Sequence, residues 1–327
     1  MKRFRMVAAV VAAAVLLFAT LFFTVDLVRQ NAELLLLKIT GRMWTLRGEL
    51  RSVNVPNDAL KAPRLTYIYT PPGYKAGDKS RTYPVLYLLH GYPDFGDMGW
   101  VKFGRAPQLI DELIVDGKIP PIIVVAPSGQ GVGGFGDSEY VDAVNPATAN
   151  KPGARMMEFI AEDLPHWVDA NYNVAAEPSK RWIGGASTGA YGAVNIALQH
   201  PLQFGAAISL SGYYTADDSG DARPVWGYHP TRQQLQAQSP AAYVTSAPDK
   251  QWRNSFFYIA YGTHERSHYR NEADTLVRDL RAAGVPCVLR SSSGKHSWDL
   301  WRTQLIEAVQ IVAKQSSTTA PAVKAKR

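Results

Sequence analysis

The stretch Arg181-Trp182-Ile183-Gly184-Gly185-Ala186-Ser187-Thr188-Gly189-Ala190 contains a serine in the pattern G-x-S-x-G. A short apolar run precedes the pattern, and residues 190–198 suit a helix. A strand, a sharp turn and a helix are the setting in which this pattern raises a serine hydroxyl above a sheet. Strand and helix cross closely there, so small neighbours are needed, and glycine and alanine supply them. We therefore predict a nucleophile at Ser187. The competing interpretation is a glycine-rich turn that holds a serine by chance.

Apolar runs alternate with helical patterns along the rest of the chain. The runs predict strands at residues 65–70, 84–89, 121–126, 206–210, 256–260 and 285–290. The patterns predict helices at 107–115, 156–172, 273–283 and 299–313. Pro165 should kink or break the second of these helices. Such alternation is typical of a mostly parallel sheet with helices on both faces. With G-x-S-x-G at one strand end, it predicts an α/β-hydrolase fold.

The net charge of +7 on this chain of 327 residues comes from its two ends. Three basic residues precede position 6, and four follow position 313. The remaining 28 basic residues equal the 28 acidic ones, so a nucleic-acid-binding surface is not expected. The 46% of hydrophobic residues can form a substantial core. The single cysteine, Cys287, excludes an intrachain disulfide.

Residues 6–25 carry no charge and follow Lys2, Arg3 and Arg5. About 20 apolar residues suffice to cross a bilayer. The basic flank keeps the N-terminus cytoplasmic, which leaves the rest of the chain outside. A cleaved signal peptide is the alternative, although its apolar region is usually shorter, at about 7–15 residues. We favour an uncleaved anchor, and both alternatives predict an exported catalytic body.

Composition divides the chain into four parts. Residues 1–25 are the predicted anchor or signal segment, and residues 26–57 a predicted stem. Residues 58–313 are the predicted catalytic domain, in which 212–250, rich in Pro, Gly, Asp and aromatic residues, is a cap-like insertion. The low-complexity tail, 314–327, is predicted to be disordered.

A serine nucleophile requires a general base, which an acid must orient. In this fold the chain order is Ser, acid, His. His296 follows the last predicted strand and is the expected base. Glu265 follows the strand at 256–260 and is the expected acid, with Asp274 in reserve. The N–H groups of Thr188 and of Tyr92, which follows the strand at 84–89, are the expected oxyanion donors.

Four motifs together resemble the esterase D family, which includes feruloyl esterases, S-formylglutathione hydrolases and the secreted mycolyltransferases of mycobacteria. They are Leu88-Leu89-His90-Gly91, Gly185-Ala186-Ser187-Thr188-Gly189, Gly262-Thr263-His264-Glu265 and Gly294-Lys295-His296-Ser297-Trp298-Asp299-Leu300-Trp301. The resemblance covers about residues 65–313. It implies a Ser187–Glu265–His296 triad with oxyanion donors at Tyr92 and Thr188. Residues 212–250 do not match the family pattern, which leaves the substrate open.

Two further motifs suggest other functions. Residues 131–136 fit the dinucleotide pattern G-x-G-x-x-G, but no helical pattern follows them, so we expect a loop. His264-Glu265-Arg266-Ser267-His268 fits H-E-x-x-H, the zinc hydrolase pattern, which requires a helix. A strand just before this motif disfavours that alternative. A third alternative is a catalytically silent, membrane-tethered binding protein.

The sequence thus predicts a membrane-anchored, extracytoplasmic serine carboxylesterase or acyltransferase that works through an acyl-enzyme. The expected substrate is an acyl ester, and esters of lipids and carbohydrates are among the candidates. No cofactor and no metal are expected. Hydrolysis and acyl transfer remain alternatives at this stage.

Overall fold

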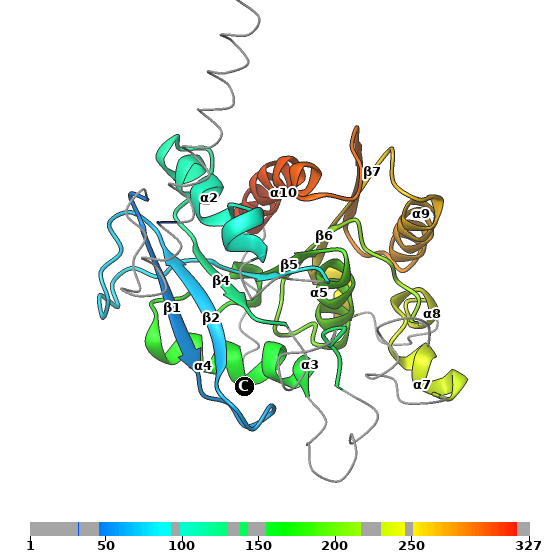
Figure 1. The fold of residues 1–327 in the computed structure, drawn as a ribbon, viewed down its shortest axis with the longest axis horizontal. Coiled ribbons are helices and arrows are strands. Elements are labelled where there is room, and N and C mark those ends of the chain that lie inside the picture. Colours follow the sequence, from blue (N-terminus) through cyan, green and yellow to red (C-terminus); the bar gives the residue numbers. More distant parts are fainter. Residues whose placement is uncertain are drawn as a thin grey trace, which may run out of the picture.

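The computed structural model of the protein describes Ala32 and residues 46–92, 99–129, 138–142, 155–216, 230–245 and 251–318. Within these residues, eight strands form one sheet in the order β1-β2-β4-β3-β5-β6-β7-β8, which crosses the middle of the molecule (Figure 1). The strands are β1 (Glu49–Val55), β2 (Arg64–Thr70), β3 (Val85–Leu89), β4 (Ile123–Pro127), β5 (Arg181–Ala186), β6 (Ala206–Leu210), β7 (Phe256–Gly262) and β8 (Cys287–Ser292).

The sheet is parallel from β4 to β8, and only β1 and β2 at one edge are antiparallel. The predicted, mostly parallel sheet is therefore confirmed. Because parallel strands point the same way, their carboxyl ends meet at one edge of the sheet, where α/β proteins place their sites. The residues that follow β3, β5, β7 and β8 are brought together there.

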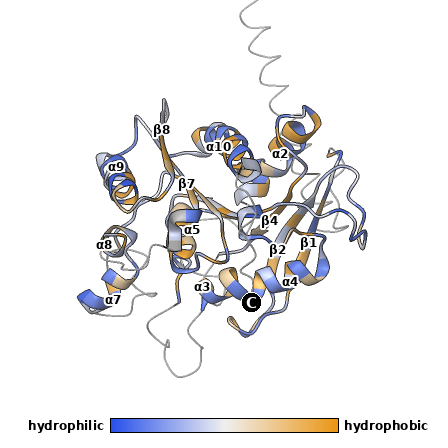
Figure 2. Cartoon of the chain, turned by 180° about the vertical axis from the view of Figure 1, so that it is seen from behind, coloured by the Kyte–Doolittle hydropathy of each residue, from blue (hydrophilic) through white to orange (hydrophobic). Residues whose placement is uncertain are grey.

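Helices cover both faces of the sheet. Helices α2 (Ala106–Val115) and α10 (Trp298–Thr318) pack on one face. Helices α4 (Leu164–Asn171), α5 (Thr188–Gln199) and α9 (Ser267–Ala282) pack on the other. Strands β3, β5 and β6 are fully buried between the two layers. Figure 2 shows hydrophobic residues along the strands and hydrophilic ones on the outer sides of the helices.

The remaining helical segments are short. They are η1 (Gly99–Phe103), α3 (Met156–Glu158), η2 (Phe159–Asp163), η3 (Pro178–Lys180), α7 (Arg232–Ala237), α8 (Pro240–Tyr243) and η5 (Gln251–Asn254). The predicted helix at 156–172 is divided into α3, the π-helical η2 and α4, and Pro165 lies in the first turn of α4. Proline has no N–H to donate into the preceding turn, which explains the break there.

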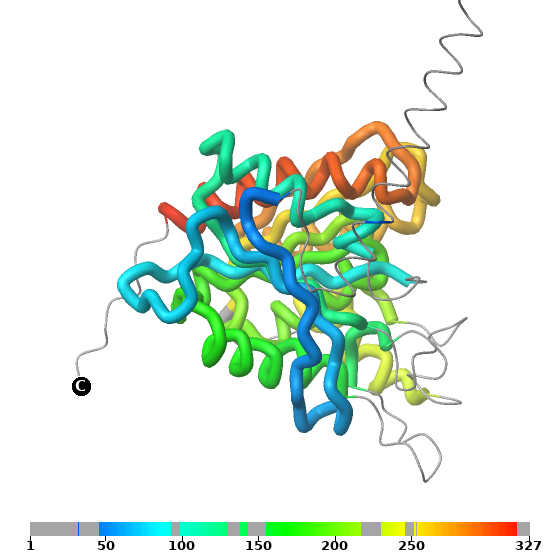
Figure 3. The backbone as a smooth tube through the Cα atoms, turned by 60° about the vertical axis from the view of Figure 1, so that its left-hand side comes forward, coloured from blue at the N-terminus to red at the C-terminus, as the bar shows by residue number. Residues whose placement is uncertain are grey.

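Two predicted boundaries are wrong. The predicted stem, 26–57, includes β1, which pairs along its whole length with β2 and forms the hairpin in front in Figure 3. Its Leu50 and Val55 are 1% and 0% exposed, so β1 belongs to the domain core. The predicted disordered tail, 314–327, begins too early, because α10 continues to Thr318.

Several predicted segments lie outside the described residues. They are the anchor or signal segment at 6–25, the G-x-G-x-x-G stretch at 131–136, and parts of the insertion at 212–250. In the described part of that insertion, α7 and α8 are present. Over the ranges given above, the structure contains no helix that is long and apolar enough to cross a membrane.

Candidate active site

Ser187 lies in the sharp turn between β5 and α5. Its backbone, with φ 56° and ψ −120°, has a conformation that non-glycine residues rarely adopt. The turn is held by the Ser187 N–H, which donates to Leu210 O of β6 at 2.9 Å. Gly189 cannot carry a side chain, because a Cβ there would lie 2.2 Å from Leu89 O of β3. The predicted strand, turn and helix are therefore present, with the serine at the carboxyl end of β5.

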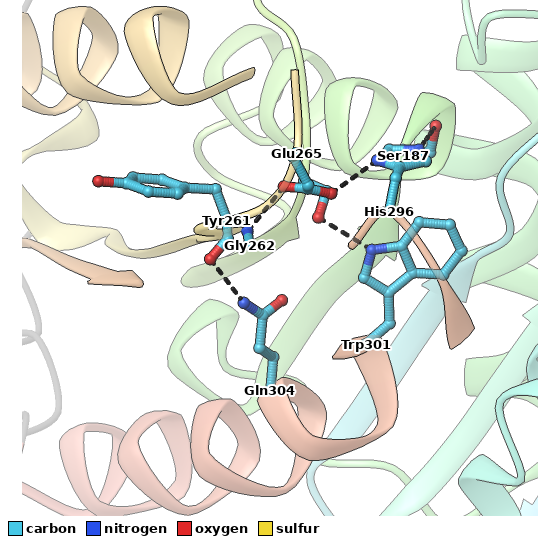
Figure 4. A network of polar contacts seen from close by, with 8 residues as sticks. Ser187, Tyr261, Gly262, Glu265, His296, Trp301 and Gln304 are labelled. Carbon is cyan, nitrogen blue, oxygen red and sulfur yellow. Dashed lines mark hydrogen bonds and ion pairs between the residues drawn. The ribbon is translucent and has the colours of Figure 1, made fainter. Parts of the chain in front are cut away.

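His296 and Glu265 reach this serine from two other strand ends. His296 follows β8, and its Nε2 lies 2.9 Å from Ser187 Oγ. Its Nδ1 lies 2.7 Å from Oε1 of Glu265, in the turn after β7. The three predicted side chains thus form one continuous chain of hydrogen bonds (Figure 4). The Ser187 hydroxyl therefore has a proton acceptor in His296, and the Glu265 carboxylate orients that acceptor.

Glu265 is held as a carboxylate. Only 1% of its side chain is exposed, and this burial by itself would raise its pKa. Hydrogen bonds outweigh burial and lower the pKa of Glu265 below its usual value: they come from His296, from the Gly262 N–H at 2.7 Å and from the Ser211 hydroxyl. A charged acid at this position stabilises the imidazolium that forms when His296 takes a proton.

Three residues around the triad were not predicted from the sequence. Tyr269, in the first turn of α9, stacks on the His296 ring at 4.6 Å and 21°. Trp301 of α10 meets the same ring edge-on at 4.8 Å, and its Nε1–H donates to Ser211 Oγ at 2.9 Å. Ser211 follows β6, so its position after a strand end could have identified it. The sequence around Tyr269 contains no comparable signal.

The two predicted oxyanion donors, Thr188 and Tyr92, belong to the two segments that adjoin the serine. Thr188 is the first residue of α5, where the helix dipole favours negative charge. Tyr92 follows Gly91, and Gly91 lies against the turn, because a Cβ on it would be 3.1 Å from Ser187 Cβ. The loop after β3 therefore reaches Ser187 from the side of β3. Tyr92 is 40% exposed, and its role as an oxyanion donor stays a prediction.

His90 holds this loop in place. Its Nε2 accepts from the Gly129 N–H at 2.7 Å, so Nδ1 carries the ring proton and donates to Gly91 O at 3.0 Å. The Tyr140 hydroxyl donates to His90 O at 2.9 Å. These bonds tie the loop after β3 to the loop after β4. A structural role for His90 explains why a buried histidine lies next to the nucleophile.

The H-E-x-x-H stretch is not a helix. His264 and Glu265 lie in the turn after β7, and α9 begins only at Ser267, so His264 and His268 do not share a helical face. Glu265 faces His296 instead of a metal position between these histidines. No cluster of three His, Cys, Asp or Glu side chains suited to a metal occurs within the described residues. Asp274, the reserve acid, is exposed on α9.

Comparison with known proteins identifies the family. The family described as "Putative esterase" matches residues 58–311, and the chain belongs to it. An uncharacterized protein of Corynebacterium glutamicum is 28% identical over 267 residues, which are 77% of this chain and 57% of that protein. An endo-1,4-beta-xylanase/feruloyl esterase of Xylanibacter ruminicola is 29% identical over 181 residues, 54% of this chain and 24% of that protein. The chain thus spans about half or less of these curated relatives.

Solved structures confirm the fold. A ferulic acid esterase superposes with a TM-score of 0.70 at 23% identity, over 83% of this chain and 99% of that one. The α/β-hydrolase fold and the resemblance to the esterase D family are both confirmed. Membership of a family described as esterases agrees with the predicted class of enzyme, a serine ester hydrolase or acyltransferase.

Proposed function

We propose that this protein is a serine carboxylesterase or acyltransferase in which Ser187, His296 and Glu265 form the catalytic triad. The observation that carries the proposal is the unbroken hydrogen-bond chain from Ser187 Oγ through His296 to Glu265, at 2.9 and 2.7 Å. The strained backbone of Ser187 supports the same assignment, because such strain is concentrated at functional positions.

In this mechanism the Ser187 hydroxyl donates its proton to His296 Nε2 as Oγ attacks the ester carbonyl carbon. Glu265 accepts from Nδ1–H and remains ionised. The N–H groups of Thr188 and Tyr92 stabilise the oxyanion of the tetrahedral intermediate. The C–O bond then breaks, and the leaving alcohol takes the proton from Nε2. Water or a second alcohol attacks the resulting acyl-enzyme by the same steps in reverse.

The molecule that accepts the acyl group, water or an alcohol, determines whether the enzyme is a hydrolase or a transferase. The test is a panel of acyl esters of increasing chain length, each with and without a sugar alcohol, and the products are the free acid and the new ester. We expect ester cleavage by the wild type and a loss of at least about 10³-fold in Ser187→Ala. Cleavage that is unchanged in Ser187→Ala would overturn the proposal.

We also propose that residues 6–25 anchor the protein in a membrane, with the catalytic domain on the outer side. The uncharged segment behind three basic residues supports this. The protein should stay with membranes after a high-salt wash, while its catalytic domain remains open to external protease. A soluble form beginning near residue 26 would show cleavage instead.

A further inference from the structure

Tyr269 contacts both reacting side chains of the proposed triad. Its ring stacks on the His296 imidazole, with centroids 4.6 Å apart and planes at 21°. Its hydroxyl lies beside the Ser187 side chain, and this contact works against the rise in the Tyr269 pKa that burial causes. Tyr269 is half-buried, and its backbone N–H donates to Arg266 O at 3.2 Å, which fixes its place in the first turn of α9.

The imidazole is held between Tyr269 and a second aromatic residue. Trp301 meets the His296 ring edge-on at 88°, and Trp301 is itself fixed by its bond to Ser211. His268 packs on the outer side of Tyr269, at 3.9 Å between ring centroids, and is exposed. The Tyr269 ring therefore limits rotation of His296 away from Ser187, on the side that faces solvent.

The Tyr269 hydroxyl lies where protons are exchanged in the proposed reaction. The leaving oxygen must stand within reach of both the Ser187 acyl carbon and His296 Nε2, and so must the incoming oxygen. The Tyr269 ring stacks on His296 and its hydroxyl lies beside the Ser187 side chain, so Tyr269 borders this position. Burial raises the pKa of Tyr269 above its usual value, and the nearby Glu265 charge adds to this effect. The phenol thus stays protonated at neutral pH and can donate a hydrogen bond.

We propose that Tyr269 is a positioning residue with two separable parts: its ring fixes the His296 plane, and its hydroxyl borders the subsite for the leaving and incoming alcohol. This inference rests on the proposed function. In this proposal Tyr269 influences whether water or an alcohol reacts with the acyl-enzyme. A purely structural tyrosine would tolerate phenylalanine without effect on that choice.

The experiment compares Tyr269→Phe and Tyr269→Ala with the wild type of the full chain. The control is Tyr261→Phe, at a half-buried tyrosine of β7 whose ring points away from Ser187 (Figure 4). Two esters of butyric acid are used: p-nitrophenyl, whose leaving group needs no proton, and ethyl, whose leaving group does. The kcat/KM of each is measured, together with the ratio of transfer to hydrolysis with glycerol as acceptor and the rate of fluorophosphonate labelling.

Tyr269→Phe should keep the labelling rate and the p-nitrophenyl kcat/KM within about threefold of the wild type, because the stacked ring remains. Its ethyl-ester kcat/KM should fall about tenfold or more, and its transfer-to-hydrolysis ratio should change at least about threefold. Tyr269→Ala should also slow labelling about tenfold or more, and Tyr261→Phe should match the wild type.

Equal losses for the two esters in Tyr269→Phe, or an unchanged transfer ratio, would overturn the inference while leaving the proposed function intact. If the proposed function itself is wrong, the wild type will neither cleave esters nor be labelled at Ser187. In that case this inference fails too. If Tyr269→Ala does not fold, Tyr269→Phe still decides, because it keeps the ring.

Discussion

Each of the three histidines near Glu265 has a different environment. His296 is bonded to Ser187 and Glu265 and lies between two aromatic rings. His264 and His268 are exposed, one in a turn and the other at the start of α9. The residues of the H-E-x-x-H pattern are therefore close in sequence but occupy different environments in the fold. Of these three histidines, His296, which is 31 positions from Glu265 in sequence, is the one whose side chain is shown to hydrogen-bond Glu265.

Alanine substitutions at these histidines should have very different effects. His296→Ala should lose about three or more orders of magnitude in kcat, because triad members act as a unit. His264→Ala and His268→Ala should each keep most of the activity, as should the wild type after treatment with a chelator. Steady-state ester hydrolysis measures all four. Loss of activity in His264→Ala, in His268→Ala or with chelator, together with activity that survives in His296→Ala, would support a zinc enzyme instead.

Glu265→Gln removes the charge and keeps the shape of the side chain. We expect kcat to fall by about 10²–10⁴-fold, since the neutral amide no longer stabilises the imidazolium. The lowered pKa of Glu265 also links its charge to stability. A lowered folded-state pKa stabilises the protein above the unfolded-state value, about 4.3. This contribution is lost as the pH falls through the folded-state pKa.

Urea unfolding at several pH values measures this linkage. The gap in unfolding free energy between wild type and Glu265→Gln should be constant above about pH 6 and shrink below about pH 4. Asp274→Asn is the matched control, because Asp274 is exposed on α9, and it should change neither activity nor stability. A gap that widens on acidification would contradict the assignment of a charged Glu265.

Secondary structure could be predicted from the sequence where the pattern of apolar residues was strong. The prediction failed where that pattern was weak. The strands before Ser187, Glu265 and His296 contain short apolar runs, and their positions identified these three as residues after strand ends. Their catalytic roles stay predictions. β1 was missed because Glu49–Val55 alternates weakly and carries charged and polar residues on its open side. Tyr269 could not be found, since its contact with His296 depends on how α9 packs.

Helix α2 holds the segment before β1 through one buried carboxylate. Asp111, 5% exposed, accepts from the Gly48 N–H at 2.7 Å, the Arg47 N–H at 3.2 Å and the Tyr69 hydroxyl at 2.9 Å. Asp111→Ala should destabilise the protein by about 2–4 kcal/mol, because it leaves the buried Tyr69 hydroxyl and two partly buried N–H groups without a partner.

The same helix offers a control for this substitution. Asp116 at its end pairs with Lys118, and both side chains are more than half exposed. Asp116→Ala should change the unfolding free energy by less than about 0.5 kcal/mol. Urea denaturation compares the two variants. Equal effects would show that the Asp111 contacts do not stabilise the fold.

The whole domain begins before the family match. The match starts at residue 58, but β1 pairs with β2 and contributes Leu50 and Val55 to the core. The sequence predicted the central sheet and both helical layers, because these have strong periodicity. It could not predict the edge, because an edge strand is buried on one side only.

Two fragments test this boundary. A fragment of residues 46–318 should unfold cooperatively. One of residues 58–318 should lose several kcal/mol of stability, since burial of each of the two side chains contributes about 1.5–3 kcal/mol and β2 becomes an open edge. Urea midpoints and solubility compare them. Equal urea midpoints for the two fragments would show instead that the domain begins at residue 58.

The most direct test of the proposed triad is fluorophosphonate labelling of the intact protein, read by peptide mass spectrometry. We predict one adduct, on Ser187, formed at least about 10³-fold more slowly in His296→Ala and absent in Ser187→Ala. An adduct on another residue, or labelling and ester cleavage that persist in Ser187→Ala, would contradict it.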